Sequence, residues 1–277
     1  MFCNTRQGSS MNQYLSVFRM RLTAGMQYRA AAWAGVATQF FWGFMRLMIF
    51  RAFYASSNTE PPMPWHQLVS LIWLEQAFLA IIMLWHQDYS LLNDIASGHV
   101  AYELCRPYNL FKFWYARLLA YRLSNVSLRC LPILAVSFLL PAAYRMTFPA
   151  SVGAFGMFLL SLGLSLFLAT AVSMFVYILT FITLSPTGAW IITTVASEFL
   201  QGALIPIPLM PRPLQLALNF LPFRYMSDLP FRLYSGGIAG VDALTQISIQ
   251  ITWIVGLMFF GGIAFRKVLR RAVIQGG

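Results

Sequence analysis

The amino-acid sequence predicts an all-α, polytopic membrane protein with six transmembrane helices. Of its 277 residues, 59% are hydrophobic and only 10% are charged, and the mean hydropathy is +0.66. Soluble domains carry about 25% charged residues, so this composition is that of an integral membrane protein. Six apolar segments of about 20 residues, the length that crosses a bilayer as a helix, alternate with polar or proline-rich stretches.

The net charge of +11 does not indicate nucleic-acid binding. The basic residues stand at the ends of apolar segments, form no continuous patch and match no nucleic-acid-binding motif. The cysteines, Cys3, Cys105 and Cys130, lack the spacing of a disulfide framework or a zinc site.

Residues 1–29 are predicted to form a cytosolic tail followed by an amphipathic interfacial helix. Apolar side chains recur there at helical spacing, at Leu15, Phe18, Leu22 and Met26. The arginines lie outside this stripe, an arrangement typical of a helix lying on the inner membrane surface. The alternative is that this segment is the cytosolic start of the first span.

Residues 30–277 are predicted to form one transmembrane domain. Its six spans are expected at 30–53, 67–85, 117–140, 152–180, 189–206 and 246–265. Most tryptophans fall near predicted span ends, where an aromatic belt would lie.

The distribution of basic residues predicts that both termini are cytoplasmic. With that orientation the cytoplasmic pieces hold Arg6, Arg19, Arg21, Arg29, Arg106, Lys112, Arg117, Arg266, Lys267, Arg270 and Arg271. The outer pieces hold Arg145, Arg212, Arg224 and Arg232. Lys and Arg accumulate on the cytoplasmic side of spans.

Residues 94–114 form a long polar insert between the second and third spans, on the cytoplasmic side in this topology. Gly98 and Pro107 bracket a short helix-compatible piece with Glu103 near its middle. Two spans need only a few residues to turn, so we predict that this piece is a docking helix for a soluble partner. The alternative role for Glu103 and Arg106 is an i,i+3 pair that stabilises a surface helix.

Residues 197–240, between the last two spans, are apolar and unusually rich in proline. They contain Pro206, Pro208, Pro211, Pro213, Pro222 and Pro230. Prolines at this density interrupt any continuous helix. We therefore expect short helices that dip into the membrane from outside, with their irregular backbone covered by protein or by a water-filled cavity.

Charged residues within the predicted spans include Arg46, Glu75, Arg129 and Glu198. Buried charges cost several kcal/mol (about 3 or more) unless they are paired or hydrated. One interpretation is a polar belt that lines a cavity and contacts substrate. The other, which the balance of two cations and two anions favours, is mutual neutralisation, for example of Arg46 by Glu75.

Nothing in the sequence indicates an enzyme. It has no HExxH, no G-x-S-x-G, no cluster of metal ligands and no P-loop for a nucleotide. The histidines His66, His86 and His99 are solitary and stand at segment ends. We therefore expect no catalytic, cofactor-binding or metal-binding residues in this chain.

Two stretches resemble the permeases of ABC transporters of the ABC-2 exporter type, in particular a bacterial six-span subfamily of about 260 residues. The first is Ile95-Ala96-Ser97-Gly98, followed by Glu103-Leu104-Cys105-Arg106-Pro107, which is similar to the family pattern I-x-x-G … E-L-x-R-P. The second runs from Phe199-Leu200-Gln201-Gly202 through Ile205-Pro206, Pro211 and Leu221-Pro222-Phe223 to Pro230-Phe231-Arg232-Leu233-Tyr234-Ser235-Gly236.

The resemblance implies a permease subunit of the bacterial inner membrane that forms a homo- or heterodimer and is driven by two separate cytosolic ABC ATPase subunits. ATP and Mg²⁺ would bind those partners and not this chain. The expected ATPase-coupling residues are Gly98, Glu103, Leu104, Arg106 and Pro107. The expected extracytoplasmic gate residues are Gly202, Pro206, Pro211, Pro222 and Tyr234.

A second function class remains open: a secondary transporter or channel that uses the intramembrane charges. Lone carboxylates such as Glu75 would suit proton coupling, but no inverted repeat is apparent in the sequence. A membrane-embedded enzyme is a third class, which the missing catalytic motifs disfavour.

Overall fold

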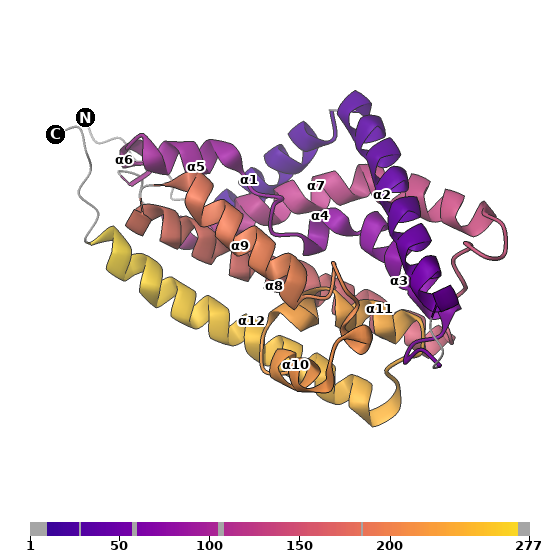
Figure 1. Ribbon diagram of the computed structural model, residues 1–277. Helices are drawn as coiled ribbons and strands as arrows, with labels where there is room; N and C mark the ends of the chain where they lie inside the picture. Colours follow the sequence, from indigo (N-terminus) through magenta and orange to yellow (C-terminus); the bar gives the residue numbers. More distant parts are fainter. Residues whose placement is uncertain (1–9, 28, 57–59, 105–107, 184, 271–277) are drawn as a thin grey trace, which may run out of the picture.

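The computed structural model is all-helical in the residues it describes, 10–27, 29–56, 60–104, 108–183 and 185–270 (Figure 1). The α-helices are α1 (Ser10–Gly25), α2 (Arg29–Ser56), α3 (Trp65–Ala77), α4 (Leu79–Ile82), α5 (Tyr89–Ala96), α6 (Ala101–Leu104), α7 (Leu110–Leu139), α8 (Val152–Thr183), α9 (Pro186–Leu200), α10 (Arg212–Leu218), α11 (Asp228–Tyr234) and α12 (Gly240–Leu269). Two short 3₁₀ helices, η1 (Ile207–Leu209) and η2 (Phe223–Met226), lie on either side of α10.

Within the described residues, three helices are long and apolar enough to cross a membrane. They are α7, α8 and α12, of 30, 32 and 30 residues. They coincide with the predicted spans at 117–140, 152–180 and 246–265, and α7 begins seven residues earlier than predicted. The side chain of Asn109 sets that start, because it accepts a hydrogen bond from the backbone N–H of Lys112 (3.1 Å). The chain is thus a membrane protein with an all-α fold.

The other three predicted spans take different forms. Helix α2 covers the first and has 28 residues, but polar side chains such as Gln39 and Arg46 lower its hydropathy. The second span is divided at Phe78 into α3 and the four-residue α4. The fifth is covered by α9, which ends at Leu200 because Gly202 follows with φ +85°. Six membrane crossings therefore remain a prediction.

Helix α8 is the centre of the fold. It packs against α4, α5, α7, α9, α11 and α12. In its apolar 18-residue segment, 61% of the residues are buried. In the apolar 18-residue segment of α12 only 17% of the residues are buried, so most of that helix faces outward. A buried amide joins the two helices: Gln250 Nε2 donates to the carbonyl oxygens of Ser161 (3.0 Å) and Tyr225 (2.8 Å).

The N-terminal helix α1 packs along α7. Of the predicted apolar stripe, Phe18 and Leu22 are half-buried, whereas Leu15 and Met26 are exposed. The two helices meet most closely at Gly25, where an added Cβ would lie 2.3 Å from Ser124 Oγ. The helix therefore has a protein-facing side, and its exposed apolar side chains remain available to a membrane surface.

The polar insert and the helix that leads into it are packed elements of the fold. Helix α5 buries Leu91, Leu92 and Ile95 in a cluster that also contains Trp114 and Phe265. Gly98, at φ +79°, turns the chain from α5 to α6, a backbone conformation that other residues rarely adopt. Figure 1 shows α5 and α6 at the same end of the molecule as the C-terminal end of α12. Within the predicted helix over 99–106, α6 covers Ala101–Leu104, and residues 105 and 106 lie outside the described residues.

Substitution of Gly43 by alanine is expected to destabilise the packing of α2 on α3. An added Cβ would lie 2.8 Å from Cζ3 of Trp73, whose side chain is fully buried between Phe40 and Phe44. We expect a loss of about 1–3 kcal/mol, measured as a lower thermal unfolding temperature in detergent. Gly163→Ala is the control, because no atom lies within 4 Å of that added Cβ. Equal unfolding temperatures for the two variants would contradict this packing.

Candidate functional site

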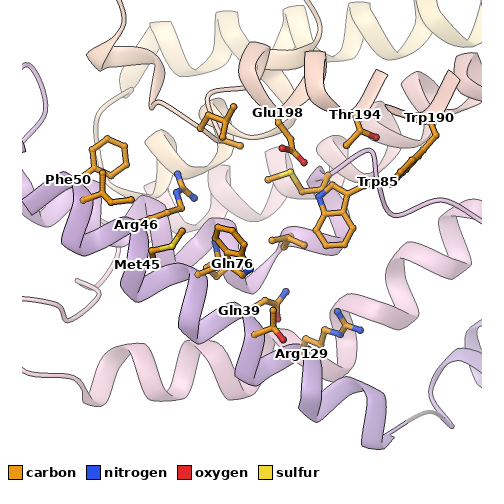
Figure 2. Close-up of a pocket in the computed structure, with 18 residues that line it drawn as sticks. Gln39, Met45, Arg46, Phe50, Gln76, Trp85, Arg129, Trp190, Thr194 and Glu198 are labelled. Atoms are coloured by element: carbon orange, nitrogen blue, oxygen red, sulfur yellow. The ribbon is translucent and has the colours of Figure 1, made fainter. Parts of the chain in front are cut away.

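A cavity of about 720 Å³ lies between α2, α3, α4, α7 and α9 (Figure 2). Helix α2 contributes Gly35, Gln39, Trp42 and Arg46, which are spaced three or four residues apart and so lie on one helix face. The residues of α9 that line the cavity also share one helix face. Trp190, Thr194 and Glu198 stand four residues apart and project into the cavity from the side opposite α2.

The four intramembrane charges predicted from the sequence gather at this cavity. Arg46, Arg129 and Glu198 line it, and Glu75 lies directly behind Arg46. Arg46 Nη1 donates to Glu75 Oε2 at 2.5 Å, and the exposed fractions of the two side chains are 13% and 2%. Both sequence interpretations thus describe part of the site: Arg46 is neutralised by Glu75, and its guanidinium also faces the cavity.

The Arg46–Glu75 pair is connected to the proline-rich stretch. Ser227 Oγ donates to Glu75 Oε1 at 3.5 Å. The next residue, Asp228, is buried and accepts from Arg224 Nε at 3.2 Å, with Arg232 Nη1 at 3.7 Å. The sequence topology placed Arg224 and Arg232 in an outer loop, and their buried partner was not predicted. The sequence does carry an indication of these pairs, because Asp228 lies four positions from each arginine, a spacing at which helical side chains meet.

Arg129 and Glu198 have no ion-pair partner among the described residues. The Arg129 guanidinium rests against α2 at Gly35, where an added Cβ would lie 2.7 Å from Cζ. Figure 2 shows Arg129 and Glu198 on opposite sides of the cavity. The cavity therefore carries one uncompensated cation and one uncompensated anion, on different walls.

Arg122, a fully buried residue two turns before Arg129 on α7, was not predicted from the sequence. Its Nη1 donates to the carbonyl oxygens of Ala80 (3.2 Å), Ile81 (2.8 Å) and Met83 (2.9 Å). Its Nη2 donates to Ser173 Oγ at 2.7 Å. The cation thus satisfies the free carbonyl groups at the C-terminal end of α4, where the helix dipole is negative. The feature of the sequence that could have identified Arg122 is the position of this charged residue inside the predicted span at 117–140.

Several side chains around the cavity carry a buried polar atom that has no hydrogen-bond partner within the described part of the chain. These atoms are Gln39 Oε1, Arg46 Nη2, Gln76 Oε1, Arg129 Nε, Trp190 Nε1 and Thr194 Oγ1. Buried polar groups in proteins are almost always paired. Each of these six atoms belongs to a side chain that lines the cavity, so the cavity wall holds polar groups whose hydrogen bonding the described residues do not complete.

The predicted coupling residue Glu103 is bonded within the chain. Its carboxylate accepts from Trp114 Nε1 at 2.6 Å and lies 3.5 Å from Arg117 Nη1. Arg117 also donates to Asp88 at 2.6 Å and to Ser90 at 2.7 Å. Glu103 thus fixes α6 against the start of α7. Leu104 is half-buried against the same cluster, and Arg106 and Pro107 lie outside the described residues.

Asp88 stands at the junction between the cavity and the insert. Burial alone would raise the pKa of its carboxyl group. The Arg117 charge and the hydrogen bonds from Arg117 and Ser90 outweigh that effect and hold the pKa below its ordinary value. The carboxylate of Asp88 is therefore charged at neutral pH and ties the start of α5 to α7.

The predicted gate residues lie in the short-helix region beside the cavity. Pro206, Pro211 and Pro222 stand immediately before η1, α10 and η2. Gly202 packs against Ile207 so closely that an added Cβ would lie 2.9 Å from Cγ1 of that side chain. Tyr234 ends α11 and donates to the carbonyl oxygen of Thr147 at 2.9 Å. The cavity wall itself is formed by their neighbours Ala203 and Leu204.

One aromatic contact joins α5, the helix that leads into the insert, to the cavity. The ring of Tyr89, the first residue of α5, meets the ring of Trp190 edge-on at 5.8 Å. Its hydroxyl group donates to the carbonyl oxygen of Trp85 at 3.4 Å. Trp85 and Trp190 both line the cavity, so a displacement of α5 would act directly on the cavity wall.

The described residues contain no cluster of three or more His, Cys, Asp or Glu side chains that could hold a metal ion. Comparisons of the chain with family profiles, with characterised proteins and with solved structures gave no match. The site itself, a charged and aromatic cavity lined by α2, α3, α4, α7 and α9, is the feature from which a function is argued.

Proposed function

We propose that this chain is the transmembrane permease subunit of an ATP-driven exporter of the ABC-2 type. In this proposal it crosses the bacterial inner membrane six times, with both termini in the cytoplasm. It pairs with a second permease, either another copy of itself or a homologue, and two cytosolic ABC ATPase subunits bind ATP and Mg²⁺. The chain is a non-catalytic subunit, and the transported molecule passes through the cavity.

The contact between α5 and the cavity wall is the observation that carries the proposal. An ATP-driven permease needs a cytoplasmic element that receives force and a membrane cavity that responds to it. Tyr89 connects the two through Trp85 and Trp190. On the other side, the Arg46–Glu75–Ser227 chain of polar contacts connects the cavity to the proposed gate.

The basic end of the molecule supports the proposed orientation. Lys112, Arg117, Arg266 and Lys267 lie at the start of α7 and the end of α12, beside α5 and α6. The gate helices α10 and α11 are too short to cross a bilayer. In the proposal they dip into the membrane from the outer side and close the cavity.

A secondary transporter or channel is the second candidate, and the uncompensated charges Arg129 and Glu198 favour it. Purification decides between the two. The affinity-tagged chain, extracted from its native membrane in mild detergent, is expected to retain ATPase subunits that carry a P-loop, at one per permease. A purified chain that retains no ATPase and still transports without ATP would falsify the proposal.

Glu103→Lys is expected to reduce the amount of retained ATPase at least tenfold (roughly 1.4 kcal/mol). The substitution removes the acceptor for Trp114 and places a second cation beside Arg117, so α6 loses its position. Membrane insertion should be unchanged, because α7, α8 and α12 keep their apolar sequences. The measurement is the ratio of ATPase to permease after affinity purification.

Glu60→Lys makes the same charge change at an exposed position on the proposed outer side and serves as the control. It should retain ATPase at the wild-type ratio. Val100→Pro, which removes the N–H that bonds the carbonyl oxygen of Asp94 (3.0 Å), should reproduce the Glu103→Lys defect. Wild-type retention by both insert variants would remove the docking role of the insert.

A further inference from the structure

We infer that the cavity binds a zwitterionic molecule with an aromatic body, its anionic group facing Arg129 and its cationic group facing Glu198. The inference rests on the proposed transport function in one respect, since it treats the cavity as the substrate site. Everything else in it comes from the charges, the aromatic walls and the size of the cavity.

The charge arrangement requires both signs on the ligand. Arg46 is neutralised by Glu75 at 2.5 Å, so the cations and anions that remain around the cavity are Arg129 and Glu198. These two do not pair with each other and face the cavity from opposite walls. A simple cation would leave Arg129 without a counter-charge, and a simple anion would leave Glu198 without one. An uncompensated charge inside a membrane domain is costly, so a ligand with both groups is favoured.

The surroundings of the two charges differ in the way a zwitterion requires. Glu198 stands on the same helix face as Trp190, and Trp85 lies below it in Figure 2. A carboxylate beside indole rings suits an organic cation, because the ring faces attract positive charge. Arg129 lies beside the backbone at Gly35 and near Gln39. Its planar guanidinium suits a carboxylate or phosphate through paired hydrogen bonds.

The size and the polarity of the walls limit the ligand to a small organic molecule. A volume of about 720 Å³ lies within the range of small-molecule sites in proteins. Trp42 and Phe50 add apolar surface on the α2 side. Thr194 and Gln76 add polar side chains to the wall.

Three fluorescent probes with closely related ring systems test the inference by direct binding to the purified full-length chain in lipid nanodiscs. Rhodamine B carries both a carboxylate and an organic cation, its ethyl ester keeps only the cation, and fluorescein carries only negative charge. We expect wild-type protein to bind rhodamine B at least about tenfold more tightly than either other probe, as a charge-assisted contact predicts. Empty nanodiscs of the same lipid measure partition into the bilayer.

Two charge-removing variants assign the ends of the ligand. Arg129→Gln should abolish the preference for rhodamine B over its ethyl ester, whereas Glu198→Gln should abolish the preference over fluorescein. Arg129→Lys keeps the cation and should keep most of the preference. Arg145→Gln, which removes an exposed arginine outside the cavity, is the matched control and should bind all three probes as the wild type does.

Equal affinity of the wild type for rhodamine B and its ester overturns the inference, and so does the absence of saturable rhodamine B binding. A loss of preference in Arg145→Gln as large as that in Arg129→Gln overturns it as well. Each variant is compared only after its thermal unfolding matches the wild type. If Arg129→Gln does not fold, Arg129→Leu, which also removes the cation and should also lose the preference over the ester, supplies the test. Binding is measured without ATPase, so failure here is distinct from a failure to retain ATPase subunits.

Discussion

Replacement of Arg122 by leucine is expected to prevent the chain from folding. The guanidinium is fully buried and donates to three backbone carbonyl groups at the end of α4 and to Ser173. Its removal leaves the three carbonyl groups without these donors in a buried region of the protein. Breaking a buried charged interaction in this way costs about 3–5 kcal/mol, a large fraction of the stability of a typical domain. The measurement is the fraction of monodisperse protein after detergent extraction, together with its unfolding temperature.

Arg129→Leu is the matched control for folding. It makes the same substitution on the same helix, at an arginine that makes no hydrogen bond or ion pair within the described region. It should fold at least as well as the wild type, because a lone intramembrane charge is lost. Arg122→Lys should be intermediate, since one ammonium cannot reach both the α4 carbonyl groups and Ser173 as a planar guanidinium does. Equal yields of Arg122→Leu and Arg129→Leu would contradict the assigned role of Arg122.

The reversal of one charge in the Arg46–Glu75 pair has the second largest expected effect. Arg46→Glu leaves two carboxylates facing each other behind the cavity wall, and Glu75→Arg leaves two guanidinium groups there. Each single variant should lose about 3–5 kcal/mol of stability, because a buried charge is left without its partner. The double variant restores opposite charges and should recover most of the loss. Unfolding temperatures of the four proteins complete a double-mutant cycle.

Arg51→Glu provides the comparison for this cycle. It reverses a charge on the same helix at an exposed position beside Tyr144. Exposed charged contacts contribute about 1 kcal/mol or less, so this variant should remain close to the wild type. If the two single variants at Arg46 and Glu75 show independent defects that add in the double variant, the two residues do not stabilise the protein as a pair.

The sequence located most of the helices because their signals are local. The apolar runs behind α7, α8 and α12 could be read directly, since hydrophobic length is a sum over neighbouring residues. The break at Phe78 between α3 and α4 could not, because no proline or glycine marks it. The carbonyl groups freed just after that break bond Arg122 from another helix, and a long-range partner of this kind leaves no local pattern.

The candidate site was predictable in its residue types but not in its pairing. Arg46, Glu75, Arg129 and Glu198 could be recognised as unusual inside apolar segments. Which of them pair depends on how α2, α3, α7 and α9 pack, and the structure pairs only the first two. Glu103 was recognised as a prominent residue of the insert, yet its partners Trp114 and Arg117 lie on the following helix.

Composition and the order of apolar and polar segments thus determined by themselves that this is an all-α membrane protein with a polar insert and a proline-broken stretch. The tertiary structure alone decided that α5, the helix that leads into the insert, touches the cavity wall through Tyr89. It also decided that Arg122 bonds the carbonyl groups at the end of α4, and that Arg129 and Glu198 stay uncompensated on opposite walls. The physical reason is range. Hydrophobicity and helix breaking act between neighbours along the chain, whereas the state of a buried charge is set by whichever helix packing brings beside it.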